Sequence, residues 1–306
     1  MQALVSIIIP CFDREDLLPD TLESVLNQTY TNWECVIVDD HSADATPKIG
    51  KEYAARDGRI ILVKRPLERP KGAASCRNIG LERTKGKFIQ FLDSDDLLHP
   101  HKLEFHLKYA RERVLLTGRW GYFSGEDLFE RFKYKQKSYR NFRNPLKLLV
   151  CFGRNDEFMP LHSYLIPREL IEKAGEWKED LGNNDDAEYM SRVLLHASRV
   201  KFVPDALVFY RVEGKSTLSG FSTYSEKLEF PELVTRFMKA EHGWVKNTYD
   251  LYNLVLRKHL NGEPLPANPT SRAIHIRHIN ACWNWGLKNK LIDKAFKIPG
   301  DTKGES

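Results

Sequence analysis

Short runs of β-branched and other apolar residues alternate with segments of helical periodicity over the first hundred positions. Four runs have the length and composition of buried strands: residues 5–10, 33–38, 60–64 and 88–92. Three helical patterns lie between them: residues 13–28, 45–56 and 72–86. Strands that alternate with helices at this spacing predict an α/β fold, with a mostly parallel sheet covered by helices.

The pattern becomes more varied after residue 100. We expect helices over residues 100–113 and 168–174, and strands over 114–118, 159–167, 200–203 and 206–211. From residue 225 the strand–helix alternation ends, and three long helical patterns follow: residues 226–239, 244–260 and 271–296. The chain is therefore predicted to divide into a catalytic domain, residues 1–220, and a C-terminal helical region, residues 221–306.

The composition is that of a folded globular protein, with 42% hydrophobic and 29% charged residues over 306 positions. The net charge of +5 is slight and does not indicate a nucleic-acid partner. The five cysteines are scattered without a CxxC pair, which predicts reduced thiols. A strand begins within a few residues of Met1 and no apolar run approaches about 20 residues, so we expect a cytoplasmic protein without a signal peptide.

Acidic residues follow two of the predicted strands. Asp39 and Asp40 come after the second strand, and Asp93, Asp95 and Asp96 come after the fourth. Each cluster alone could be a turn, a helix cap or a solvated loop. Ligands of open parallel sheets bind beyond the carboxyl ends of the strands, so two clusters at equivalent ends favour one shared site.

Oxygen ligands select a hard cation, Mn²⁺ or Mg²⁺, which typically bridges substrate phosphates. The first strand is not followed by GxGxxG and the sequence has no GxxxxGK[ST] loop, so glycine-rich phosphate cradles are not expected. The sequence therefore predicts a metal-bound nucleotide diphosphate.

Several ordered motifs together resemble the inverting family-2 glycosyltransferases, which have the glycosyltransferase A-type fold. The motifs are Ser6-Ile7-Ile8-Ile9-Pro10-Cys11-Phe12, Ser24-Val25-Leu26-Asn27-Gln28-Thr29, Val38-Asp39-Asp40-His41-Ser42-Ala43-Asp44, Arg77-Asn78 and Asp93-Ser94-Asp95-Asp96. The resemblance covers residues 1–220 and implies a Rossmann-like sheet. Two departures are Cys11-Phe12, where the family usually has an aromatic residue and then Asn, and His41, where Gly is common.

The resemblance also implies which residues bind the nucleoside and which bind the metal and diphosphate in a nucleotide-sugar site. Pro10, Asp39 and Asp40 would line the base and ribose pocket, and Arg77 would also reach the nucleotide. Asp95 and Asp96 would lie at the ribose and the metal, with Asp93 completing or supporting the cluster. Arg211, at the end of the last predicted strand, and Lys215, in the mobile loop that follows it, would approach the diphosphate, although a solvated loop is an equal alternative.

A third acidic pair, Asp185-Asp186, opens an apolar-periodic helix, where either Asn184 or Asp185 could simply be an N-cap. In the family an acidic pair at a helix start is followed by Arg, six positions after its second member. Asp186 and Arg192 match that spacing, so the role of general base is carried over to Asp186. The resemblance implies transfer of a sugar from a nucleotide-diphosphate donor, most often UDP-linked, to a hydroxyl of a saccharide or lipid-linked acceptor.

Some interpretations stay open from the sequence. The aromatic and basic residues between 120 and 147 fit an amphipathic helical insertion, an acceptor-binding wall or a membrane-proximal surface. The C-terminal helices fit packing on the catalytic domain or peripheral contact with the inner face of a membrane. His162 fits either a residue facing the site or a core histidine. The alternative function is a nucleotide-sugar-binding module or scaffold without turnover.

Overall fold

The computed structural model describes residues 2–123, 136–155, 157–179 and 185–212. Nearly all of these residues belong to one compact unit, whereas residues 150–157 belong to a second. The predicted domain boundary at residue 220, the C-terminal helices, Cys282 and Lys215 lie outside the described residues.

Eight strands form a sheet in the order β3-β2-β1-β4-β7-β6-β8-β5. The strands are β1 (Val5–Cys11), β2 (Trp33–Asp39), β3 (Ile60–Lys64), β4 (Phe88–Phe91), β5 (Leu97–Leu98), β6 (Val114–Phe123), β7 (Tyr164–Pro167) and β8 (Arg199–Arg211). Strands β3, β2, β1 and β4 pair with one another in parallel, and β6 and β8 form a second parallel pair. Strands β5 and β7 pair in the antiparallel sense. The predicted α/β class with a mostly parallel sheet is confirmed.

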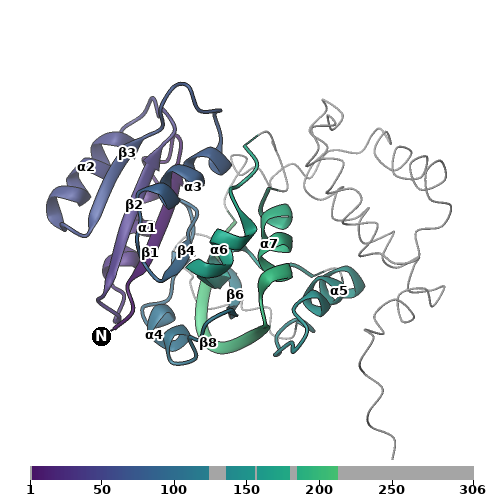
Figure 1. Ribbon diagram of the computed structural model, residues 1–306. Coiled ribbons are helices and arrows are strands. Elements are labelled where there is room, and N and C mark those ends of the chain that lie inside the picture. The colour runs from purple at the N-terminus through teal and green to yellow at the C-terminus, as the bar shows by residue number, and fades with distance from the viewer. Residues whose placement is uncertain (1, 124–135, 156, 180–184, 213–306) are drawn as a thin grey trace, which may run out of the picture. The chain divides into compact units, whose positions relative to one another are not determined.

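Helices cover both faces of the parallel half of the sheet (Figure 1). The helices are α1 (Leu18–Leu26), α2 (Thr46–Arg56), α3 (Ala73–Glu82), α4 (Lys102–Leu107), α5 (Leu146–Asn155), α6 (Arg168–Ala174) and α7 (Asp185–His196), with a 3₁₀ turn at Leu161–Ser163. Helix α3 packs on Val36 and Val38, and α2 approaches Leu62, which pairs with Ile37 and so points to the opposite face. This arrangement buries β1 on both sides and explains its unbroken apolar run.

Several predicted elements were wrong in extent; the strand expected over residues 159–167, for example, is only Tyr164–Pro167, because a 3₁₀ turn precedes it. Helix α1 begins only at Leu18, with Pro19 in its first turn, and Asp13, within the predicted range, has a left-handed φ of 49°. The helix expected over residues 100–113 is only Lys102–Leu107, and Arg113 is left-handed with φ 56°. The two strands expected over residues 200–211 form one strand, β8.

The aromatic segment after residue 119 also differs from the prediction. Strand β6 continues to Phe123, so Trp120 and Tyr122 lie in a strand and not in a helical insertion. Residues 124–135 lie outside the described part. Cys11, Cys35, Cys76 and Cys151 are buried free thiols, as expected. Within the described part, no helix combines the length and hydrophobicity needed to cross a membrane.

Candidate active site

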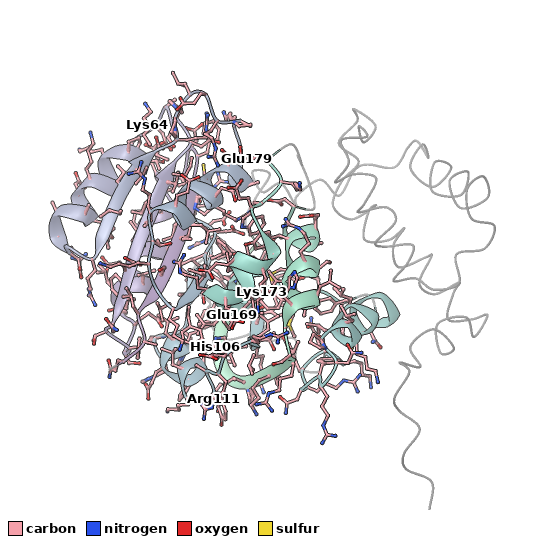
Figure 2. All side chains as sticks on the ribbon, in the orientation of Figure 1. Lys64, His106, Arg111, Glu169, Lys173 and Glu179 are labelled. Atoms are coloured by element: carbon pink, nitrogen blue, oxygen red, sulfur yellow. The ribbon has the colours of Figure 1, made fainter. Side chains whose placement is uncertain are left out.

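The carboxyl ends of β1, β2 and β4 meet at one edge of the sheet and carry the first two acidic clusters. Backbone hydrogen bonds fix their register there: the Asp40 N–H donates to the Cys11 carbonyl at 2.9 Å, and the Leu92 N–H donates to the Ile8 carbonyl at 3.0 Å. Figure 2 shows Lys64, the last residue of β3, and Glu179 toward this edge, with His106 and Arg111 at the other end. Parallel pairing therefore brings together clusters that are fifty residues apart in the chain.

Asp39 and Asp40 both hold neighbouring chain segments. Asp40 forms a buried ion pair with Arg65, and its second oxygen accepts the Gly72 N–H at 2.9 Å. Asp39 accepts the Ser42 N–H at 3.2 Å. Both carboxylates thus order the loops around the predicted nucleotide position, where Pro10 lies within β1. Arg65, one residue beyond β3, was not anticipated, since nothing in its local sequence identifies a partner 25 positions away.

The loop after β4 is built around Asp96. Its Oδ1 accepts the Arg211 N–H at 2.9 Å. Its Oδ2 lies 2.9 Å from Nδ1 of His162, an ion-pair distance, although the angles are not those of a regular hydrogen bond. Asp96 and His162 are both buried. His162 is therefore a core histidine that also faces the candidate site, so the two alternatives from the sequence are both met.

Asp95 is the carboxylate of this loop that is least neutralised by neighbouring cations. Arg14 Nε lies 3.8 Å from its Oδ2. Burial, together with the negative charges of Asp96 and Asp93, raises the pKa of Asp95 to about 7. Burial also raises the pKa of Asp96, and His162 opposes that shift. A cation among these oxygens would relieve the repulsion that raises the pKa of Asp95.

The donor set of this loop fits a hard divalent cation. The described residues contain no group of three His, Cys, Asp or Glu side chains arranged to hold a metal by themselves. Mg²⁺-type ions do not require one, because they are usually bound through one or two carboxylates together with substrate phosphates and water. Asp95 fits this requirement better than Asp96, whose two oxygens already have partners in the chain.

Arg211 and Lys215, the predicted diphosphate contacts, have different outcomes. Arg211 is buried at the end of β8, where its Nε donates to the Asp95 carbonyl at 2.7 Å. Its Nη2 donates to Asp20 at 2.9 Å, and its guanidinium lies over the Phe123 ring. Arg211 therefore supports the acidic loop from within the sheet and does not belong to the loop that follows. Lys215 lies outside the described residues.

The third acidic pair begins α7. Asp185 Oδ2 accepts a hydrogen bond from Arg77 Nη1 at 2.7 Å, and Asp186 Oδ1 accepts the Ala187 N–H at 2.9 Å. Arg192 pairs with Glu188 at 2.7 Å and donates to the Ala174 and Glu176 carbonyls. The Arg192 of the motif thus fastens α7 to the end of α6.

The Arg77-Asn78 motif joins α3 to the chain before α7. Asn78 Nδ2 donates to the Trp177 carbonyl at 2.9 Å, and the Trp177 N–H donates to Asn78 Oδ1 at 2.8 Å. Glu179, labelled in Figure 2, accepts from Asn78 at 2.9 Å and pairs with Arg69. The motif could be recognised in the sequence, but its contact with Trp177 could not be predicted from it.

Acidic clusters at the carboxyl ends of parallel strands lie where α/β proteins with open sheets bind their ligands. The sequence pattern described as Glycosyl transferase family 2 matches residues 6–172. The chain belongs to this family.

Two curated relatives agree with this membership. The chain is 44% identical over 119 residues to TuaG of Bacillus subtilis (strain 168), named for glycosyltransfer in teichuronic acid biosynthesis, covering 39% of this chain and 46% of TuaG. It is 37% identical over 136 residues to the UDP-Glc:α-D-GlcNAc-diphosphoundecaprenol β-1,3-glucosyltransferase WfgD of Escherichia coli, covering 44% of this chain and 52% of WfgD. These matches thus span about half the length of each relative.

The fold is similar to the crystal structure of S. aureus TarS 1–349 in complex with UDP-GlcNAc. The TM-score is 0.60 at 18% identity, covering 94% of this chain and 81% of TarS 1–349. At this identity the comparison supports the fold.

Proposed function

We propose that this chain is a metal-dependent inverting glycosyltransferase that moves a sugar from a nucleotide-diphosphate sugar to a hydroxyl acceptor. The observation that carries the proposal is the meeting of two separate acidic groups, the loop at residues 93–96 and the pair Asp185-Asp186. Both groups contact the same buried side chain, Arg77. In such a transfer one acidic group would hold the cation that stabilises the departing diphosphate, and the other would take the proton of the attacking hydroxyl.

The donor is proposed to be a UDP-sugar. WfgD is named for a UDP-linked donor, and the structure of TarS 1–349 contains UDP-GlcNAc. Pro10, Asp39 and Asp40 would border the base and ribose, with Asp39 contributing the carboxylate oxygen that does not bond to Ser42. Asp40 would act chiefly by ordering the Gly72 loop, because both its oxygens contact the chain.

Asp95 is proposed to bind the divalent cation, Mn²⁺ or Mg²⁺. When bound, the ion would supply positive charge at the diphosphate oxygens as the sugar bond breaks. Asp96, the other predicted ligand, would contribute mainly by fixing the loop through Arg211 and His162. Arg211 would keep the backbone of Asp95 in place.

Asp186 is proposed as the general base. Its carboxylate would take the proton of the acceptor hydroxyl while that oxygen bonds to the anomeric carbon of the donor sugar. The bond between this carbon and the diphosphate oxygen would break at the same time, and the nucleoside diphosphate would leave with the electron pair. The first turn of α7 places Asp186 beside Asp185, which is attached to Arg77.

The acceptor is proposed to be a saccharide or a lipid-linked saccharide in cell-surface polysaccharide or glycolipid synthesis. The names of TuaG and WfgD support this setting. A lipid-linked acceptor would be met at a membrane surface, and contact through the C-terminal helices stays a prediction about residues outside the described part.

The decisive experiment is UDP release from a panel of UDP-sugars by the full-length protein, with Mn²⁺ and with EDTA. We expect metal-dependent release with at least one donor, increased by a lipid-linked or oligosaccharide acceptor, and lost in Asp186→Asn. Tight nucleotide binding without turnover across the panel would favour the binding module, and turnover undiminished by EDTA would exclude the proposed metal.

A further inference from the structure

A single buried arginine connects the two acidic groups of the proposed site. Arg77 lies in α3 with only 5% of its surface exposed. Its Nη2 donates to Asp93 Oδ1 at 2.8 Å and its Nη1 donates to Asp185 Oδ2 at 2.7 Å. Its guanidinium also lies 4.6 Å from the centre of the Trp177 ring.

These contacts engage the first carboxylate of each acidic group. Asp93 begins the loop that carries Asp95, and Asp185 precedes Asp186 at the start of α7. The two carboxylates lie 92 positions apart in sequence, and Arg77 precedes both. The side chain therefore links two elements whose relative position decides the distance between the donor side and the acceptor side of the reaction.

We propose that Arg77 is a positioning residue that sets the separation of Asp95 and Asp186, rather than a direct nucleotide contact. The inference rests on the proposed function, because it assigns those two carboxylates to the metal and the base. Arg77 is fixed on three sides, by Asp93, by Asp185 and by the aromatic face of Trp177. Loss of either carboxylate would be costly, because Arg77 is a buried ion and each carboxylate neutralises part of its charge.

The chemistry of the contact specifies arginine. A planar guanidinium presents separate N–H groups to two carboxylates at once, whereas a lysine ammonium is a point charge on a flexible stem. Lysine at this position would keep the charge and lose the fixed geometry. Misplacement of reacting groups by about 1 Å can reduce turnover on the order of 10²-fold.

The test uses full-length Arg77→Lys, Asp185→Asn and the double variant. UDP release gives kcat and the donor KM, and calorimetry gives the Kd of UDP with Mn²⁺. We expect kcat to fall on the order of 10²-fold in Arg77→Lys, with the UDP Kd and donor KM essentially unchanged. Asp185→Asn removes the charge that Arg77 pairs with and should lower kcat in the same way. The double variant should be no slower than Arg77→Lys, because both substitutions weaken the same ion pair.

Arg59→Lys is the matched control. Arg59 also pairs with an aspartate, Asp57 at 2.6 Å, and also lies over a tryptophan ring, that of Trp33, but it precedes β3 at the amino edge of the sheet. It should leave kcat unchanged. The inference is overturned if Arg77→Lys weakens UDP binding while kcat is retained, or if Asp185→Asn turns over at the wild-type rate.

Hydrogen exchange separates failure of this inference from failure of the proposed function. Amides of residues 185–190 should exchange faster in Arg77→Lys than in the wild type, while those of β2 stay unchanged. If wild-type protein turns over no donor, the proposed glycosyltransfer fails, and the exchange result still decides whether Arg77 holds α7. Unchanged exchange over residues 185–190 would overturn the inference in either case.

Discussion

At the scale of single residues, the most direct prediction concerns Asp186. Replacement by Asn keeps the shape of the side chain and its ability to accept the Ala187 N–H, but removes the group proposed to take a proton. General base catalysis typically contributes about 10²–10⁴-fold, so kcat for UDP release should fall by that order. The Kd of UDP measured by calorimetry should stay at the wild-type value, and near-wild-type turnover would remove Asp186 from the mechanism.

Asp95 gives a second residue-scale prediction, about pH. Its pKa of about 7 in the folded protein lies above the ordinary value of 3.8, so between these values the folded chain holds a proton that the unfolded chain has lost. The free energy of unfolding of the metal-free protein should therefore decrease as pH rises through this window, by up to about 1.4 kcal/mol per pH unit from this group. Urea unfolding at pH 5.5 and 7.5 measures the decrease.

Asp95→Asn should reduce that pH dependence, because the amide does not ionise. Glu52→Gln is the control, because Glu52 forms an exposed helical ion pair with Lys48. It should leave the change of the free energy of unfolding with pH as it is in the wild type. If the free energy of unfolding of Asp95→Asn changes with pH as much as that of the wild type, Asp95 has its ordinary pKa in the folded protein.

The sequence could identify which residues are acidic and where they cluster, but not their partners. Asp93, Asp95, Asp96 and Asp185 were all recognisable from motifs. That Asp96 contacts His162 and the backbone of Arg211 depends on tertiary contacts 66 and 115 positions away, which local patterns do not encode. For this reason the sequence assigned Asp95 and Asp96 equally to a metal, whereas their contacts make them different.

At the scale of elements, the packing of α3 on β1 makes a stability prediction. A Cβ added at Gly80 would lie 2.3 Å from Cγ2 of Ile8, inside the buried strand. Gly80→Ala should lower the free energy of unfolding by about 1–3 kcal/mol, the usual cost of overpacking. The midpoint of urea unfolding measures this loss of stability, provided that the m-value is the same in both proteins.

Gly58→Ala is the control for this prediction, because a Cβ at Gly58 would meet nothing within 4 Å. It should change stability little. Equal stabilities of the two variants would show that β1 and α3 can separate locally without cost.

Element types were predicted well where one periodicity dominates and less well where backbone geometry decides. The apolar runs of β1 to β4 identified four parallel strands within a residue or so, because strands of a covered parallel sheet are rich in apolar residues. The left-handed residues Asp13 and Arg113 lie in segments that were wrongly expected to be helical, and no apolar signal marks them. The aromatic residues of β6 resembled a helical insertion because their long pairing with β8 is a tertiary property.

At the scale of the whole described unit, the proposed site depends on distant parts of the chain meeting at one edge. The loop after β4 is held by α3 through Arg77, by the 3₁₀ turn through His162 and by β8 through Arg211. Changes in any of these elements should therefore shift the loop that carries Asp95 and Asp96. The predicted separation of roles between Asp95 and Asp96 follows from this architecture.

The last prediction tests that separation by ligand-linked stability. UDP with Mn²⁺ at a hundredfold excess over its Kd should add about 2.7 kcal/mol to the free energy of unfolding of the wild type. In Asp95→Asn the part of this gain that depends on Mn²⁺ should disappear, while stability without ligand is retained at low pH. Asp96→Asn should instead lower stability without ligand, because it leaves buried His162 without its charged partner. Chemical unfolding of each variant, with UDP alone and with UDP and Mn²⁺, measures both effects. A full Mn²⁺ effect in Asp95→Asn and none in a folded Asp96→Asn would transfer the metal to Asp96.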